Sequence, residues 1–248
     1  MGERQMAAYI RTCFRDREPL EQGLHSKAML LFRQYMIVGG MPKSVSAFLS
    51  KSERRVVMSK IEKGATFPKY HDTFFWLSDS MIANECFNCS DPNIGLSLNE
   101  DRTYVKCYMG DTGLLVSHAF DENEISDGEL YREILFGELS LNEGMFYENV
   151  IAQMLVAAGH KLYFYTHYND ELHRNDIEID FILSNNSKLK YKIFPIEVKS
   201  KEKYTTRSLE KFKAKFHARI GGNYVIHPKN LKVEGDTLFI PAYMAFCL

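Results

Sequence analysis

The stretch FPIEVKS, residues 194–200, alternates apolar and charged side chains and predicts a β-strand. Because side chains alternate along a strand, Glu197 and Lys199 share one face, while Ile196 and Val198 share the other. On an ordinary amphipathic strand the charged face simply lies in water. A functional site is the better interpretation only when further carboxylates lie beside Glu197.

A neighbouring stretch, NDIEIDFILS, repeats the alternation and supplies such carboxylates. Glu178 and Asp180 share one face of the predicted strand. The other face carries Ile177, Ile179 and Phe181. If this strand pairs with FPIEVKS, Asp180 gathers with Glu197 and Lys199 on one surface.

A predicted helix at 142–159 offers a further charged residue, Glu148. Asn142 is suited to cap this helix and Gly159 to close it. Glu148 lies at helical spacing with an apolar stripe made by Met145, Ile151, Ala152 and Leu155. A carboxylate that points toward the protein in this way needs a partner or a function.

The end of the chain follows the order helix, three strands, helix, strand. These predicted elements are a helix at 142–159, strands at 161–167, 177–183 and 192–200, a helix at 206–220 and a strand at 223–227.

A helical Glu, a strand Asp and a Glu-x-Lys on the next strand resemble the PD-(D/E)xK nuclease superfamily, whose core has the same element order. The resemblance implies that Asp180 and Glu197, with the Val198 carbonyl, offer oxygen ligands to Mg²⁺ or Mn²⁺. Lys199 would position a water or neutralise charge on the phosphate, and Glu148 would hold a metal-bound water or a second ion. Three alternatives stay open. Glu148 is only a cap or salt-bridge partner, Asp180 pairs structurally with Lys199, or the fold has lost cleavage.

The stretches YMIVGGMPKSV, KCYMGDTGLL, GMFYENVIAQML, EIDFIL and PIEVKS span most of the chain. Together they resemble the C-terminal part of the prokaryotic AAA-type ATPases that carry an uncharacterised nuclease-like domain. The resemblance implies a P-loop ATPase domain ahead of them, and ATP as a ligand of the full-length form only. A P-loop ending at Lys43 and Ser44 requires glycine at positions 37 and 42, where Ile37 and Pro42 stand. Either the chain is a truncated form or the sequence is part of a longer one, and in both cases we expect no ATPase activity from this chain alone.

The N-terminal part predicts helices followed by a strand pair. Residues 5–50 have a helical pattern that stops at Gly39 and Gly40, and residues 53–82 predict two more short helices. The strands NECFNC and TYVKCYMG follow, joined by a long turn-rich loop. Helices followed by a two-stranded wing predict a winged-helix module, which binds either DNA or protein.

Composition indicates an ordinary folded protein: 248 residues, 45% hydrophobic and 25% charged. No apolar run of membrane-spanning length is present and the start of the chain is polar, so we expect a cytoplasmic protein without a membrane partner. The five cysteines include one close pair, Cys86 and Cys89. We expect reduced, packing cysteines, with a zinc site at that pair as the alternative.

The net charge of −1 conceals a separation of charge along the chain. Residues 121–148 hold nine acids and one base, whereas residues 186–232 hold thirteen Lys or Arg and three acids. On the helix at 206–219, Lys211, Lys215 and Arg219 are therefore candidates for contacts with DNA phosphates. The alternative is a solvated basic face.

The predicted organisation is a helical and winged-helix region followed by a restriction-endonuclease-like domain with a mixed sheet flanked by helices, of class α+β or α/β. Its parts are a helical remnant at 1–52 linking to an absent ATPase domain, a winged-helix-like module at 53–119, an acidic linker at 120–141 and the nuclease-like domain at 142–248. The predicted function is that of a DNA-binding region of an ATPase-family protein with a Mg-dependent phosphodiesterase site. The alternative is a catalytically inactive nuclease-fold module that recognises DNA or protein. The expected partners are DNA and an ATPase domain or partner protein.

Overall fold

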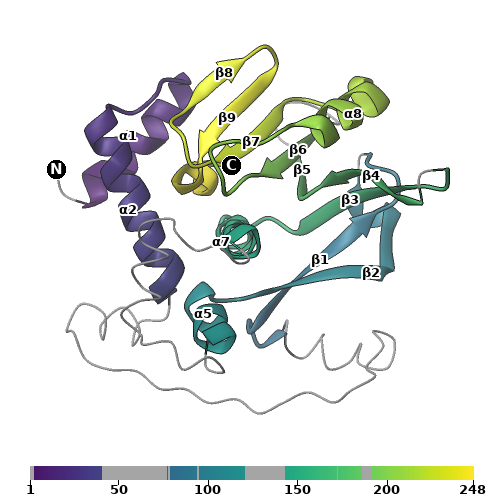
Figure 1. Cartoon of the computed structure of the whole chain (residues 1–248), viewed down its shortest axis with the longest axis horizontal. Coiled ribbons are helices and arrows are strands. Elements are labelled where there is room, and N and C mark those ends of the chain that lie inside the picture. The colour runs from purple at the N-terminus through teal and green to yellow at the C-terminus, as the bar shows by residue number, and fades with distance from the viewer. Residues whose placement is uncertain are drawn as a thin grey trace.

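The computed structural model describes residues 3–40, 77, 79–93, 95–120, 143–171, 173–185 and 192–248. These residues form an α+β structure in which helices pack on two mixed β-sheets (Figure 1). The helices are α1 (Glu3–Asp16), α2 (Gln22–Val38), α5 (Thr112–Phe120), α7 (Glu143–Ala157) and α8 (Arg207–Phe216), with 3-10 turns η1 (Leu96–Asn99), η2 (His217–Arg219) and η3 (Ala242–Cys247). In this part of the chain no helix has the length and apolar character needed to cross a membrane.

The first sheet has four strands in the order β2-β1-β3-β4. Its strands are β1 (Ala83–Cys89), β2 (Glu100–Met109), β3 (Leu162–Asn169) and β4 (Arg174–Ile179). β1 pairs antiparallel with β2 and parallel with β3, and β3 pairs antiparallel with β4.

The second sheet has five strands in the order β5-β6-β7-β9-β8. Its strands are β5 (Phe181–Asn185), β6 (Lys192–Val198), β7 (Asn223–His227), β8 (Lys232–Glu234) and β9 (Thr237–Pro241). β5 pairs antiparallel with β6, whereas β6, β7 and β9 run parallel to one another. Only Asp180 separates β4 from β5, so one bent segment connects the two sheets.

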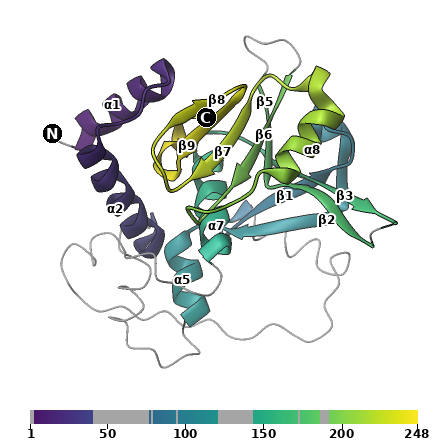
Figure 2. The same cartoon turned by 45° about the horizontal axis from the view of Figure 1, so that its top comes forward.

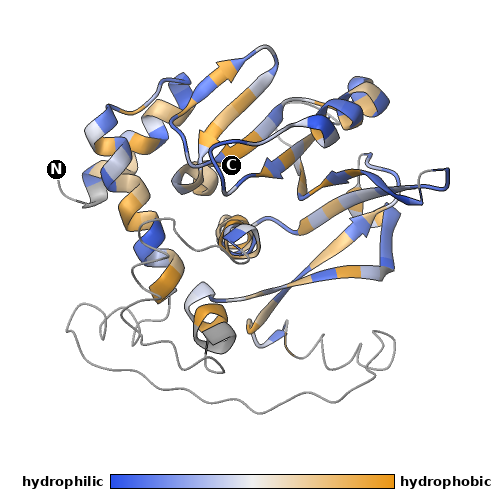
Figure 3. Cartoon of the chain, viewed as in Figure 1, coloured by the Kyte–Doolittle hydropathy of each residue, from blue (hydrophilic) through white to orange (hydrophobic). Residues whose placement is uncertain are grey.

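Helices α7 and α8 cover opposite faces of the second sheet (Figure 2). Alternate residues of its central strands enter two different hydrophobic clusters, which Figure 3 shows as a banding of apolar and polar residues along the strands. The cluster that contains the core residues of α7 takes Phe194, Ile196, Ile226 and Ile240. The cluster that contains Leu209, Phe212 and Phe216 of α8 takes Ile193, Val225 and Phe239.

The structure confirms the predicted order of helix, three strands, helix and strand in α7, β3, the β4–β5 segment, β6, α8 and β7. It adds β8, β9 and η3, which were not predicted. The expectation that Ile177, Ile179 and Phe181 share one face is wrong. Because the chain bends at Asp180, Phe181 joins the cluster of α7, while Ile182 joins Ile177 and Ile179 in the cluster of α8.

The structure confirms neither a winged helix nor a restriction-endonuclease-like fold. The two predicted wing strands exist and pair as β1 and β2, but β1 also pairs with β3, so they belong to a larger sheet. Residues 51–76, which carry most of the predicted helices of this module, lie outside the described residues, as do residues 121–142 of the predicted linker.

The close contact between the end of α2 and the start of α5, called here the joint, explains why glycine is needed at Gly39 and Gly113. Gly39 ends α2 with a φ of 72°, in the left-handed region that favours glycine. A Cβ on Gly39 would lie 1.9 Å from Asp111 Oδ1, and Asp111 Oδ2 accepts a hydrogen bond from the Gly40 backbone N at 2.5 Å. A Cβ on Gly113, the second residue of α5, would lie 2.3 Å from the Val38 carbonyl oxygen. Residues 35–40, the described part of YMIVGGMPKSV, thus contact KCYMGDTGLL where α2 ends and α5 begins.

Gly113→Ala is expected to lower the free energy of unfolding by more than about 2 kcal/mol, because the added methyl group meets backbone that cannot move aside. Gly144→Ala is the matched control, since Gly144 is also the second residue of its helix and has nothing within 4 Å of its Cβ position. The control variant is expected to be neutral or stabilised by up to about 1 kcal/mol. Equal stability of the two variants in urea denaturation would contradict this account of the joint.

Candidate metal-binding site

The structure brings two of the predicted carboxylates, Asp180 and Glu197, to the same end of the β5–β6 pair. The two strands pair with Phe181 opposite Ile196, and Asp180 and Glu197 are the next residues beyond this last pair of the register. Asp180 Oδ2 also accepts a hydrogen bond from the Val198 backbone N at 2.7 Å. Strand pairing alone therefore assembles Asp180, Glu197 and the backbone of Val198.

Glu197 is a buried carboxylate with one oxygen unused. Its side chain is only 5% exposed, and its Oε1 lies 2.7 Å from the Lys199 ammonium. Its Oε2 is buried and has no hydrogen-bond partner among the described residues. Burial raises the pKa of Glu197, and the hydrogen bond and charge of Lys199 act against that rise. A buried oxygen without a donor is costly unless a cation or donor occupies the position in front of it.

Asp180 shares its surroundings with the third predicted carboxylate, Glu148. Burial raises the pKa of Asp180 to about 7, and the negative charge of Glu148 adds to the rise. The Val198 N–H and the ammonium groups of Lys106 and Lys199 lower it in part. A buried aspartate whose ionised form is disfavoured by a neighbouring carboxylate would be stabilised by a divalent cation.

Glu148 is held on α7 by two residues of β2. Its Oε2 accepts a hydrogen bond from the Tyr108 hydroxyl at 3.2 Å and lies 3.8 Å from the Lys106 ammonium. Its side chain is 31% exposed, so it is directed toward the protein without being enclosed. The structure therefore contains the alternative salt bridge of Glu148, which is formed with Lys106. Glu148 still lies close enough to Asp180 for its charge to act on the Asp180 carboxylate.

Sequence reasoning missed Lys106 and Tyr108 as members of this group. Lys106 Nζ lies 3.1 Å from Glu178 Oε1 in addition to its contact with Glu148. Burial lowers the pKa of Lys106, but the neighbouring carboxylates outweigh burial and hold it above its usual value. The alternation in TYVKCYMG places both residues on one face of β2, and this was the available signal.

Comparison with known families adds two matches. Residues 143–244 match DUF4143, a domain of unknown function. DUF4143 is found in AAA-ATPase-associated proteins, which agrees with the predicted association with an ATPase. The match does not show a nuclease-like domain. Residues 49–124 match a second domain of unknown function, DUF8612. No curated protein and no solved structure matches the chain.

The candidate site draws on both matched segments. The DUF4143 match contains all four side chains predicted from the sequence, which are Glu148, Asp180, Glu197 and Lys199. The DUF8612 match contains Lys106 and Tyr108. The carboxylates thus come from one family segment, while part of their cationic surroundings comes from the other.

The described residues contain no preformed group of three or more His, Cys, Asp or Glu side chains arranged around a metal. The donors that the structure does bring together are the carboxylates of Asp180 and Glu197 beside the backbone of Val198. All are oxygen donors, which suit Mg²⁺ or Mn²⁺ better than softer metals.

The three cations predicted to contact DNA all have partners within their own chain. The contacts are Lys211 Nζ to Asp176 Oδ2 at 3.3 Å, Lys215 Nζ to the Tyr165 hydroxyl at 2.9 Å and Arg219 to Asp91. The first two contacts join α8 to β4 and β3 of the first sheet, and the third joins η2 to the residues that follow β1. By contrast, Lys201 and Lys203 on the loop after β6 and Arg207 at the start of α8 are exposed and lie close to Lys199 in the chain.

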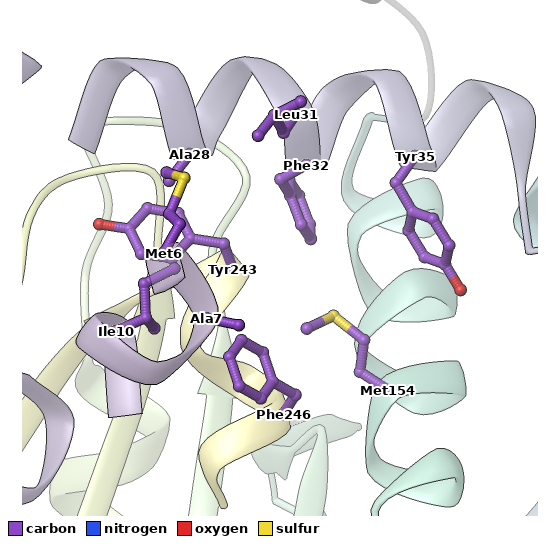
Figure 4. Close-up of a pocket in the computed structure, with 10 residues that line it drawn as sticks. All are labelled: Met6, Ala7, Ile10, Ala28, Leu31, Phe32, Tyr35, Met154, Tyr243 and Phe246. Carbon is purple, nitrogen blue, oxygen red and sulfur yellow. The ribbon is translucent and has the colours of Figure 1, made fainter. Parts of the chain in front are cut away.

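An apolar cavity lies apart from the carboxylates, between α1, α2, α7 and η3. Its volume is about 320 Å³, and in Figure 4 Phe32 and Met154 point into it. The hydroxyl groups of Tyr35 and Tyr243 point away from it and bond to Gln153 and His25. The other lining residues are Met6, Ala7, Ile10, Ala28, Leu31 and Phe246. With no acid, base or nucleophile directed into it, this cavity offers no catalytic chemistry.

The zinc alternative at Cys86 and Cys89 finds little support in their surroundings. Both thiols are buried, and burial raises the pKa of Cys86 and of Cys89, the latter to about 11. Zinc binds thiolates, so a raised pKa opposes binding. Cys86 lies in the cluster of α7 and Cys89 in the cluster of α8, which agrees with the prediction of packing cysteines.

Proposed function

We propose that this chain is the nuclease-like region of an ATPase-associated protein, which binds DNA and hydrolyses a phosphodiester at a divalent metal held by Asp180 and Glu197. The observation that carries the proposal is the buried Oε2 of Glu197, which has no hydrogen-bond partner among the described residues, at the same end of the β5–β6 pair as an aspartate of raised pKa. Burying two adjacent carboxylates weakens a fold unless a cation joins them. A site maintained at that cost indicates a function.

The residues present fit Mg²⁺ or Mn²⁺. Asp180 and Glu197 would hold the ion through carboxylate oxygens, with the Val198 carbonyl as a further ligand. When bound, the metal would polarise the phosphodiester and lower the pKa of a water. Glu148 lies close enough to Asp180 to affect its ionisation and would accept hydrogen bonds from water at the same site.

Lys199 would supply positive charge to the phosphate that reacts. In the structure its ammonium pairs with Glu197 Oε1 at 2.7 Å and is 24% exposed, so it reaches the surface from the carboxylate site. A cation in this position stabilises negative charge that develops on a phosphoryl group. The exposed Lys201 and Lys203 on the loop that follows, and Arg207 at the start of α8, would contact flanking phosphates. ATP hydrolysis would belong to an ATPase domain acting with this region.

The deciding experiment measures metal binding and DNA cleavage on the same samples. Calorimetric titration of Mn²⁺ into the chain is expected to show binding that Asp180→Ala abolishes, and plasmid nicking with Mg²⁺ or Mn²⁺ is expected to be lost in the same variant. Asp176→Ala is the matched control, because Asp176 also lies on the β4 segment but pairs with His167 and Lys211 outside the site. The control is expected to bind metal and nick DNA as the unaltered chain does.

Two results would change the conclusion. Absence of Mn²⁺ binding in the unaltered chain would sink the metal site. Metal and DNA binding without nicking would leave the alternative of an inactive nuclease-fold module that recognises DNA.

A further inference from the structure

Lys106 lies on β2 and points toward the carboxylates of Glu148, Glu178 and Asp180. Its ammonium lies 3.1 Å from Glu178 Oε1 on β4, 3.8 Å from Glu148 Oε2 on α7 and 5.1 Å from the centre of the Phe164 ring on β3. Its side chain is 25% exposed. Contacts from three separate elements hold the ammonium in place, whereas most lysines at a protein surface extend into solvent.

The charges around Lys106 do not balance without a further cation. The group contains the carboxylates of Glu148, Glu178, Asp180 and Glu197 and the ammonium groups of Lys106 and Lys199. When all are ionised, the carboxylates exceed the ammonium groups by two charges. A single divalent ion would neutralise this excess, whereas two divalent ions would leave a net positive charge.

The two lysines, Lys106 and Lys199, pair with different carboxylates of the site. Lys199 pairs with Glu197, and Lys106 pairs with Glu148 and Glu178. The oxygen with no partner among the described residues, Oε2, belongs to Glu197, the carboxylate that Lys199 pairs with. An incoming cation would therefore find an unused oxygen at Glu197, whereas Glu148 already pairs with a cation.

We propose that Lys106 is the resident cation of the Glu148 side, so that the site takes one divalent metal ion, at Asp180 and Glu197, and Lys106 weakens its binding by repulsion. The statement about metal stoichiometry rests on the proposed function. The role of Lys106 as partner of Glu148 does not. The DUF8612 segment thereby sets the metal affinity of carboxylates that lie in the DUF4143 segment.

The sign of the change in metal affinity tests this role. Lys106→Met keeps the length and packing of the side chain and removes its charge, so Mn²⁺ is expected to bind on the order of tenfold more tightly in calorimetric titration. Lys161→Met is the matched control, because Lys161 also pairs with a glutamate, Glu100, at 2.9 Å and lies over two aromatic rings, but away from the site. This control is expected to leave Mn²⁺ affinity unchanged. If K106M fails to fold, Lys106→Gln replaces it.

A double-variant cycle without metal tests the partnership directly. Lys106→Met, Glu148→Gln and the double variant are compared by thermal unfolding in a chelating buffer. The double variant is expected to unfold at a higher temperature than the sum of the two single shifts implies, because each single change already removes the contact between Lys106 and Glu148 and the second change cannot remove it again. Additive shifts would overturn the inference.

The outcomes separate this inference from the proposed function. Unchanged or weaker Mn²⁺ binding in K106M would overturn the inference while leaving the metal site intact. Binding in K106M but not in the unaltered chain would support the inference and contradict metal binding by the natural site. If neither binds, the proposed function fails, and the double-variant cycle alone decides whether Lys106 is the resident cation.

Discussion

A fragment of residues 142–248 is expected to show no cooperative unfolding transition, although it contains the whole of the predicted nuclease-like domain. In the structure β3 is an inner strand that pairs with β1 through Cys86, Phe87 and Asn88. Cutting away residues before 142 turns β3 into an edge strand and exposes Phe164, which is fully buried in the complete chain. Exposed apolar edges of this kind lose hydrophobic stabilisation and invite aggregation.

The same cut removes the partner of a buried amide on α7. The Asn149 side chain accepts a hydrogen bond from the Met109 backbone N at 2.7 Å and donates one to the Met109 carbonyl at 3.1 Å. Each buried polar group left without a partner costs roughly 1–3 kcal/mol, and a whole domain is stable by only about 5–15 kcal/mol. The prediction is tested by comparing the near-UV circular dichroism and the thermal unfolding of the fragment with those of the complete chain. A sharp transition with native-like near-UV signal in the fragment would show that the boundary at 142 divides two independent domains.

Local patterns in the sequence predicted the parts of the fold that depend on short-range physics. The two-residue period of FPIEVKS and NDIEIDFILS predicted strands where β6, β4 and β5 lie, and the antiparallel pairing of β5 with β6 brings Asp180 to the end of the strand pair where Glu197 lies, whereas the bend at Asp180 was not predicted. The helix predicted at 142–159 is α7, and Gly159 follows it with a φ of 94°. In both cases the information lies within a few residues of the element it specifies.

The parts that were not predicted depend on contacts between distant segments. The parallel pairing of β1 with β3 joins strands that are far apart in the chain, and no period within either strand specifies that partner. The recruitment of Lys106 to Glu148 follows from this pairing, because β2 lies beside β1. Similarly, the basic helix face was predicted as a DNA contact because charge alone does not show that Asp176 and Tyr165 already bind Lys211 and Lys215.

The unaltered chain is expected to lose stability as pH rises from about 5 to 8, and Asp180→Asn is expected to remove most of that loss. The folded-state pKa of Asp180 is about 7, well above the 3.8 of an unperturbed aspartate. The folded protein therefore binds more protons than the unfolded chain between these values, and its stability declines with pH across that interval. About two of these units lie between pH 5 and the folded-state pKa, and at 1.36 kcal/mol each they set an upper limit of roughly 3 kcal/mol for the decline. Glu197, whose pKa burial also raises, acts in the same direction.

Urea denaturation at several pH values in a chelating buffer measures this effect, with Asp176→Asn as the matched control. The His167 hydrogen bond, with further help from Lys211, lowers the pKa of Asp176, so its contribution is present above the unfolded pKa and is lost only in acid. The control should therefore keep the decline between pH 5 and 8, whereas D180N should be nearly flat and more stable than the unaltered chain at pH 8. Adding Mn²⁺ at pH 8 should restore stability to the unaltered chain and not to D180N, because the ion then takes the place of the missing proton. Parallel curves for D180N and the unaltered chain would mean that Asp180 titrates normally and that Glu148 and burial do not act on it as the geometry indicates.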